Sequence, residues 1–187
     1  MRDARTTPGA MTAPPVMARL FLALWPDAAV RTALADWRDR CGWPAGAAIV
    51  ATPKLHLTLH FIGAVPAGQL DAVADGLRVA VPPAFDLLFD RIAAWPRGLV
   101  ALETRRAPPP QLAELHRALA AALQALGLPV ERRRLRPHVT LARRATGARL
   151  AEPGEPLRWR VDGYALVRSH LGRVDADQAY EVLRRYG

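Results

Sequence analysis

Two short segments of the sequence carry the same spacing of chemically useful residues. The segment HLTLHF begins at His56 and has Thr58 two residues later. The segment HVTL begins at His138 and has Thr140 two residues later. Side chains alternate between the two faces of a β-strand, so each histidine shares a face with its threonine while apolar residues fill the other face. We therefore expect two strands that each bury one face and present an imidazole and a hydroxyl on the other.

A pair of imidazoles suits acid–base chemistry on a tetrahedral anion. An unperturbed imidazole titrates near pH ~6.5, so a neutral ring can accept a proton from water while a protonated ring gives one to a departing alkoxide. Threonine hydroxyls can donate to nonbridging phosphate oxygens and are too weakly acidic to act as proton donors. If the two strands face each other across a cleft, the fitting substrate is a phosphodiester. His56 and His138 are then the predicted acid–base pair, and Thr58 and Thr140 the phosphate-binding groups.

Other chemistries fit the sequence less well. His56 and His60 have the i, i+4 spacing of a helical zinc motif, but Leu57 stands where that motif has glutamate, and a strand lacks the shared helical face. We therefore predict no metal site. Ser169 precedes His170 without a Gly-x-Ser-x-Gly turn, which argues against a serine hydrolase. The sequence has no Walker loop and no dinucleotide fingerprint, which argues against ATP- or NAD-dependent chemistry.

Composition narrows the class of protein. A chain of 187 residues with 51% hydrophobic content is sufficient for one domain with a substantial core. The net charge of +9 indicates a polyanionic partner, although Lys54 is the only lysine and a GC-rich coding bias toward arginine explains the charge equally well. The single cysteine, Cys41, excludes an intramolecular disulfide and favours the reducing cytoplasm.

The start of the chain differs in composition from the rest. Residues 1–16 have a charged start but lack the roughly 7 to 15 apolar residues of a secretory signal. We predict a disordered N-terminal extension over 1–16 and a single bilobal domain over 17–187. No run approaches the roughly 18 to 20 apolar residues that cross a bilayer, so no membrane association is expected.

Apolar periodicity divides the chain into two similar halves. The first half predicts strands at 19–25, 48–50 and 54–63 and helices at 26–40 and 66–81. The second half predicts strands at 85–95 and 98–104 that pair with each other, followed by a helix at 109–129. It then predicts a strand at 136–143, a loop at 145–156, and strands at 158–171 and 179–186. Each half therefore has strands, a helix and one His-x-Thr strand, which indicates a duplicated unit.

The segments HLTLHFIG and RPHVTLAR resemble the paired His-x-Thr motifs of the two-histidine phosphoesterases, specifically the RNA 2′,3′-cyclic phosphodiesterases, also called 2′-5′ RNA ligases. The resemblance runs from about Arg19 to Tyr186. It includes RLFLALWP near the start, Gly63 after the first motif, and the final pattern RSHL…Y with Ser169 and Tyr180. It implies an α+β fold of two pseudo-twofold lobes, in which two antiparallel sheets with helices outside enclose a central groove.

The resemblance also implies an activity. Members of this family open the terminal 2′,3′-cyclic phosphate of RNA to a 2′-phosphate without a metal or nucleotide cofactor, and the same role is expected on RNA ends or nucleotides here. No obligate protein partner is predicted. Two alternatives remain open: an RNA-binding module that no longer catalyses, for which ERRRLRPH is the arginine-rich approach, and 2′-5′ ligation or another cyclic phosphodiesterase reaction in the same groove.

Arg143, after the second motif, matches the arginine that supports the phosphate or neighbouring nucleotide in this family. Strict alternation puts Arg143 on the strand face opposite to His138. Its entry into the groove therefore requires a β-bulge or an early end to the strand.

The first motif also has features of its own. Ala64 follows Gly63 where the family often has an acidic residue. Strict alternation places His60 on the groove face, at a solvated strand end, and Phe61 on the core face. Trp95 is expected in the core rather than stacked on a base.

Overall fold

The computed structural model describes residues 16–131, 133–152, 154–170, 175 and 178–187. The predicted extension lies outside these residues except for Val16, so that prediction stays untested. Within the described residues the strands form two four-stranded sheets and one two-stranded sheet, all antiparallel.

The elements follow one another in an order close to the predicted one. The helices are α1 (Ala28–Asp39), α2 (Leu70–Gly76) and α3 (Pro110–Ala125). The strands are β1 (Met17–Leu24), β2 (Ala48–Ile49), β3 (Leu57–Pro66), β4 (Phe85–Phe89), β5 (Arg91–Trp95), β6 (Leu99–Glu103), β7 (His138–Arg143), β8 (Leu157–Val161), β9 (Tyr164–Ser169) and β10 (Tyr180–Tyr186).

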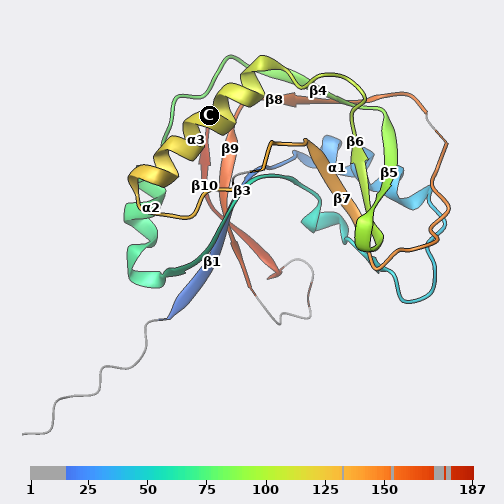
Figure 1. Ribbon diagram of the computed structural model, residues 1–187, viewed down its shortest axis with the longest axis horizontal. Helices are drawn as coiled ribbons and strands as arrows, with labels where there is room; N and C mark the ends of the chain where they lie inside the picture. Colours follow the sequence, from blue (N-terminus) through green and yellow to red (C-terminus); the bar gives the residue numbers. More distant parts are fainter. Residues whose placement is uncertain (1–15, 132, 153, 171–174, 176–177) are drawn as a thin grey trace, which may run out of the picture.

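The two larger sheets form two lobes, as Figure 1 shows, which confirms the expected bilobal α+β architecture. The first sheet has the strand order β10-β9-β1-β3, and the second has the order β2-β7-β6-β5. The lobes do not coincide with the halves of the sequence, because β9 and β10 from the C-terminal half complete the first sheet and β2 from the N-terminal half joins the second. This exchange ties the two lobes together through one continuous hydrophobic core.

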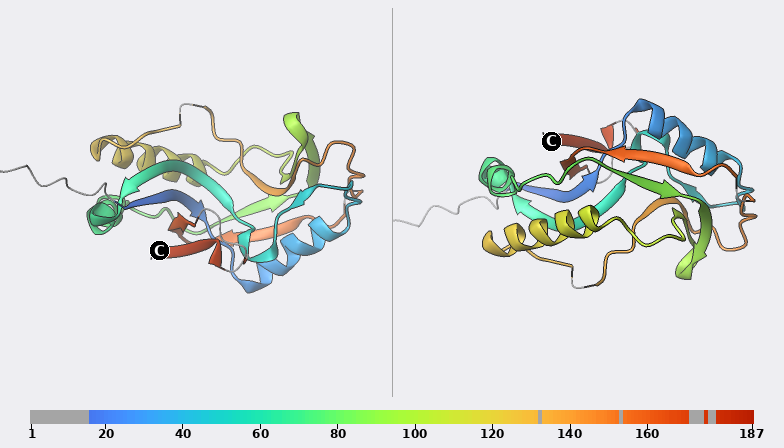
Figure 2. Two further views of the ribbon diagram at one scale, coloured as in Figure 1. Left: turned by 90° about the horizontal axis from the view of Figure 1, so that it is seen from below. Right: turned by 90° about the horizontal axis from the view of Figure 1, so that it is seen from above.

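The helices are exchanged in the same way. Helix α3, from the second half, packs on β3 of the first sheet, whereas α1, from the first half, packs on β8. Figure 2 shows α1 and α3 on opposite sides of the molecule. Helix α3 begins at a proline and buries one stripe at spacings of three and four residues, formed by Leu112, Leu115, Leu119 and Leu123.

Three predicted elements differ from the structure. The strand expected over 158–171 is divided after Val161, so that β8 pairs with β4 while β9, which begins at Tyr164, pairs with β1 and β10. The strand expected over 85–95 breaks at Asp90, so that β4 pairs with β8 while only β5 pairs with β6 around the 96–98 turn. The helix expected over 66–81 ends at Gly76. A Cβ atom at Gly76 would stand 2.6 Å from Cδ2 of Leu126, so this glycine lets the end of α3 approach closely. Apolar spacing alone indicates neither the partner of a strand nor the contact that ends a helix.

Strands β3 and β7, one from each lobe, contact each other, and this contact brings the two His-x-Thr segments together. Among the residues that the structure describes, no helix is long and apolar enough to span a bilayer.

Candidate active site

The first histidine of the site is held by its own backbone and by its threonine. His56 immediately precedes β3, and its Nδ1 lies 2.6 Å from the carbonyl oxygen of Lys54. A carbonyl only accepts, so Nδ1 carries the proton and Nε2 is the free base. The hydroxyl of Thr58 lies 3.0 Å from Nε2 and donates to it. The imidazole is thereby fixed in one tautomer with Nε2 toward the threonine.

The second histidine repeats this arrangement. His138 opens β7, and its Nδ1 lies 2.7 Å from the carbonyl oxygen of Arg136, again the residue two positions earlier. Its Nδ1 therefore donates to the backbone, and Nε2 is the nitrogen available to a ligand. Each lobe thus holds its histidine in the same tautomer by the same local bond.

Strand β7 contains the β-bulge that Arg143 requires in order to lie on the same strand face as His138. Consecutive residues of β6 pair with Thr140 and Ala142, so Leu141 is an additional residue that breaks the alternation. Leu141 and Ala142 are both buried, and Arg143 then lies exposed on the face of Thr140. The positive charge of Arg143 lowers the pKa of both His56 and His138.

Strand β3 contains the same bulge, three residues after its histidine. Consecutive residues of β1 pair with Thr58 and His60 and leave Leu59 as the additional residue. The expectation that His60 faces the groove is therefore wrong, as is the core position expected for Phe61. His60 is 1% exposed, whereas Phe61 is 58% exposed and occupies the place that Arg143 has in the other lobe.

His60 has a structural role under α3. Its Nε2 lies 2.9 Å from the carbonyl oxygen of His116, and the two imidazoles stack with ring centroids 4.0 Å apart. His60 and His56 consequently point to opposite sides of β3 and cannot share a metal ion, in agreement with the rejection of a zinc motif.

Aromatic side chains surround His56. Trp25 stacks on its ring at a centroid distance of 5.6 Å, Phe21 lies at 4.9 Å, and Tyr180 presents an edge at 5.5 Å. The guanidinium of Arg31 covers Trp25 at 5.4 Å. This packing removes water from the imidazole and strengthens its electrostatic interactions.

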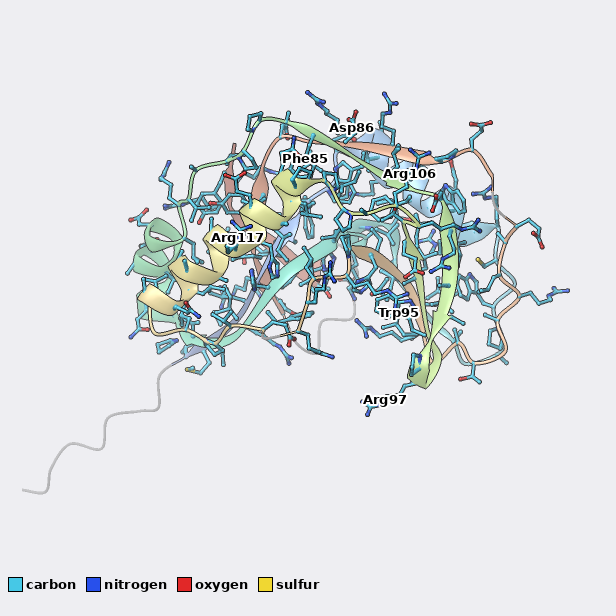
Figure 3. The ribbon with its side chains drawn as sticks, turned by 45° about the horizontal axis from the view of Figure 1, so that its top comes forward. Phe85, Asp86, Trp95, Arg97, Arg106 and Arg117 are labelled. Carbon is cyan, nitrogen blue, oxygen red and sulfur yellow. The ribbon has the colours of Figure 1, made fainter. Side chains whose placement is uncertain are left out.

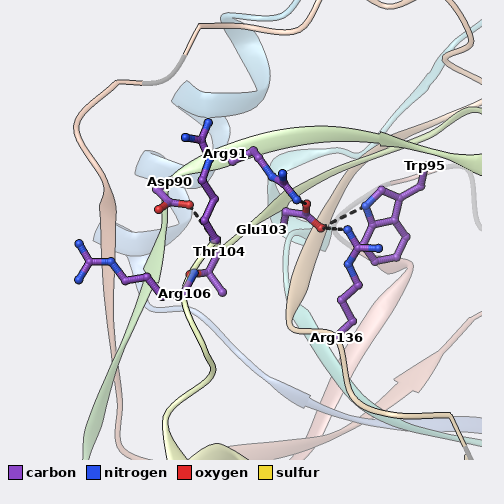
Figure 4. A network of polar contacts seen from close by, with 8 residues as sticks. Asp90, Arg91, Trp95, Glu103, Thr104, Arg106 and Arg136 are labelled. Carbon is purple, nitrogen blue, oxygen red and sulfur yellow. Dashed lines mark hydrogen bonds and ion pairs between the residues drawn. The ribbon is translucent and has the colours of Figure 1, made fainter.

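His138 has a similar but more polar support. Trp95 packs against its ring at 4.5 Å, and the guanidinium of Arg136 lies 4.1 Å from the centre of the Trp95 ring. Behind them Glu103, only 2% exposed, accepts hydrogen bonds from Arg91, from Arg136 at 2.6 Å and from Nε1 of Trp95 at 3.2 Å (Figure 4). Trp95 is therefore half-buried in the wall of the site, not in the core.

Burial and positive neighbours set the protonation of both rings. Burial lowers the pKa of His56 to about 4, and the charges of His138, Arg143 and Arg31 add to this while the Lys54 carbonyl opposes it. The pKa of His138 is lowered by burial and by Arg136 and Arg143, against the opposing effects of the Arg136 carbonyl and the carboxylate of Glu103. Both rings are neutral near pH 7, and a bound anion would favour protonation of either.

Sequence reasoning missed Glu103 and the role of Trp25. The signal for Glu103 was a single carboxylate at the end of the apolar strand LVALE, because an acidic residue in such a strand is buried only when it is paired. The signal for Trp25 was its place at the end of RLFLALW, but the ring that it covers lies 31 residues further along the chain.

Comparison with known families fits this geometry. Residues 25–173 match the family model of the 2′-5′ RNA ligase superfamily. The chain belongs to this superfamily. Two relatives, each named RNA 2′,3′-cyclic phosphodiesterase, are 32% identical to it. The one from Escherichia coli aligns over 83% of this chain and 89% of its own, and the one from Thermus thermophilus over 90% and 89%.

Solved structures of the superfamily share the fold. The crystal structure of E. coli LigT complexed with 3′-AMP has a TM-score of 0.77 and 29% identity to this chain, and covers 91% of this chain and 98% of its own. The superfamily fold therefore extends over nearly all of this protein.

Proposed function

We propose that this protein hydrolyses the 2′,3′-cyclic phosphate of RNA ends or nucleotides to a 2′-phosphomonoester. The observation that carries the proposal is the repeated arrangement at His56 and His138. Each lobe supplies a histidine with Nδ1 bonded to the carbonyl two residues earlier, a threonine on the same face, and a bulge three residues after the histidine. The names of the two relatives and the 3′-AMP bound to E. coli LigT support the same substrate class.

The proposed reaction is an acid–base displacement at phosphorus. Nε2 of one histidine takes a proton from water, and the water oxygen forms a bond to phosphorus. The bond from phosphorus to the 3′-oxygen breaks, and protonated Nε2 of the other histidine gives its proton to that oxygen. The products are a 2′-phosphate and a free 3′-hydroxyl, so atoms and protons balance without a metal ion or cofactor.

The remaining site residues bind the phosphate. Thr58 and Thr140 lie on the faces of their histidines and can each donate to a nonbridging oxygen, while Arg143 neutralises charge that develops on the phosphoryl group. The bulges bring Phe61 and Arg143 to equivalent positions beside this phosphate, one apolar and one cationic.

The test is turnover of a nucleoside 2′,3′-cyclic phosphate in EDTA, with the phosphomonoester identified by ³¹P NMR. We expect His56→Ala and His138→Ala to lose about 10² to 10⁴ in rate with the fold retained, because each removes one proton carrier. The control is His170→Ala. His170 pairs with Glu181 outside the site, and its loss should leave turnover unchanged.

Full activity in either site variant would overturn the acid–base pair. Tight, salt-dependent binding of RNA without product in the wild type would favour an RNA-binding module instead. Joining of a 2′,3′-cyclic phosphate end to a 5′-hydroxyl end in the same assay would show the ligase reaction. We further propose that residues 17–187 act as one unit and that the protein works in the cytoplasm, as its single cysteine suggests.

A further inference from the structure

A second concave region lies next to the site, on the side of His138. It is a cavity of about 390 Å³ lined by Glu103, Thr104, Arg106, Pro108, Arg134, Leu135, Arg136 and Pro137. This volume lies within the range of roughly 300–1,000 Å³ that small-molecule sites occupy, so it exceeds what a bound water or single ion requires. Its walls come from the end of β6, the segment that leads to α3 and the segment that leads to β7.

The cavity has an excess of positive charge. Its one carboxylate, Glu103, is already engaged by Arg91, Arg136 and Trp95 and is 2% exposed. Among the described residues no carboxylate lies within ion-pair distance of Arg106 or Arg134, and both are exposed. Figure 4 shows Arg106 directed away from the carboxylates of Asp90 and Glu103. Two unpaired guanidinium groups therefore remain free to bind an anion.

The cavity and the proposed active site share one segment of chain. Arg136 lines the cavity with its side chain, and its carbonyl oxygen holds Nδ1 of His138. Pro137 lies between them and is buried. The cavity and the proposed active site thus adjoin each other at Arg136, so that one extended ligand could occupy both.

We propose that this cavity binds the phosphodiester and ribose of the nucleotide that precedes the cyclic phosphate in an RNA chain. The inference rests on the proposed function and assigns this cavity, rather than the histidine pair, to recognition of the preceding nucleotide. Arg106 and Arg134 contact the phosphate, in the way that arginines bind nucleic-acid backbones without reading the bases. The Thr104 hydroxyl accepts the Arg106 amide at 3.0 Å and keeps its own proton to donate, while Leu135 and Pro108 pack against the sugar.

The experiment compares two substrates that differ by this nucleotide: a nucleoside 2′,3′-cyclic phosphate, and a dinucleotide that ends in the same cyclic nucleoside. The wild type should prefer the dinucleotide at least tenfold in kcat/KM, mainly through KM. The double variant Arg106→Gln/Arg134→Gln should lose this preference and turn over the mononucleoside substrate within twofold of the wild type. Arg117→Gln, on the exposed face of α3 (Figure 3), is the matched control and should keep the preference.

A binding measurement tests the proposed role of the cavity independently of turnover. The probe is a fluorescent oligonucleotide that ends in a 3′-phosphate, titrated with wild type and double variant at several salt concentrations. The double variant should bind at least tenfold more weakly, and its slope of log K against log salt should be shallower by up to about 0.7, the value for one lost phosphate contact on a single strand.

The outcomes separate the two proposals. Turnover without a dinucleotide preference, or a preference that survives the double substitution, overturns the cavity proposal and leaves the proposed function standing. No turnover of either substrate, with the expected loss of affinity in the double variant, overturns the proposed hydrolase activity and supports the cavity as a nucleotide-binding site. Equal affinity and equal salt slope in both proteins overturn the cavity whatever the enzyme does.

Discussion

Replacement of Glu103 by glutamine tests the buried network beside His138. The Glu103 carboxylate is 2% exposed and accepts hydrogen bonds from Arg91, Arg136 and Trp95. Glutamine has nearly the same size but no charge, and it has one acceptor oxygen in place of two. Its NH₂ group must face an N–H donor of one of the three partners, so at least one hydrogen bond is replaced by two opposed donors.

The structure allows the cost to be worked out. A hydrogen bond to a charged group contributes about 1.5–3 kcal/mol. Loss of one such bond and weakening of a second gives about 2–4 kcal/mol of destabilisation. The Arg91 and Arg136 side chains are 42% and 58% exposed, so water can solvate their charges. This keeps the cost toward the lower end, because neither cation is left buried without a partner.

Urea unfolding measures the change. With a slope of about 2 kcal/mol per molar urea, a loss of about 2 kcal/mol lowers the midpoint by about 1 M. Asp86→Asn is the matched control, since Asp86 also lies between two arginines, Arg158 at 3.9 Å and Arg160 at 3.7 Å, but is 34% exposed. An exposed pair contributes about 0–1 kcal/mol, so this variant should unfold close to the wild type. Equal midpoints for the two variants would refute the reasoning.

Glu103 should also act on catalysis as a positioning residue. Its carboxylate raises the pKa of His138 and fixes Trp95 and Arg136 against that ring. Glu103→Gln should therefore lower kcat more than it raises KM and move the limb of the pH profile that reports His138 to lower pH. Glu103→Asp, which keeps the charge, should restore the position of that limb. A change in stability with an unaltered pH profile would assign Glu103 a purely structural role.

Two further predictions follow from the pKa shifts. Burial lowers the pKa of His56 to about 4 and also lowers the pKa of His138. We therefore expect kcat/KM to be highest below pH 6.5 and to fall as the pH rises, because the free enzyme then loses its proton donor. Arg143→Gln should move this optimum toward neutral pH, because it removes a positive charge that lowers the pKa of both rings. An unmoved optimum would show that the charge of Arg143 does not act on them. Burial, reinforced by His60, lowers the pKa of His116 to about 4, so the folded state binds this proton less readily than the unfolded chain. The contribution of His116 to the free energy of unfolding should therefore be constant above about pH 6.5 and fall toward pH 4 by about 1–3 kcal/mol, a range that allows for solvent screening of this half-buried ring. His116→Gln should reduce this fall in denaturant titrations at each pH; parallel curves for variant and wild type would contradict it.

The local chemistry of the site was readable from the sequence. The spacing of His56 to Thr58 and of His138 to Thr140 defined which side chains share a strand face, because alternation over two residues needs no tertiary information. Apolar stripes likewise indicated α1, α3 and most strands, since burial of one face requires that spacing. The repeated motif also indicated two similar lobes, and the structure confirms them.

Tertiary structure determines which strand face the residues after each His-x-Thr segment occupy. The bulges at Leu59 and Leu141 reverse the alternation, and only strand pairing with β1 and β6 creates them. They turn His60 into the core and bring Phe61 to the surface, against the simple pattern, and they put Arg143 on the strand face of Thr140.

The partners of the histidines also come from distant parts of the chain. Trp25 reaches His56 from the end of the neighbouring strand β1. Trp95 and Glu103 reach His138 from the β5–β6 hairpin, and Tyr180 lies on a C-terminal strand that completes the N-terminal sheet. A sequence specifies the periodicity of its own elements, because that depends on neighbouring residues. Which elements meet depends on how the whole core closes, and in this protein that closure exchanges strands and helices between the two halves of the chain.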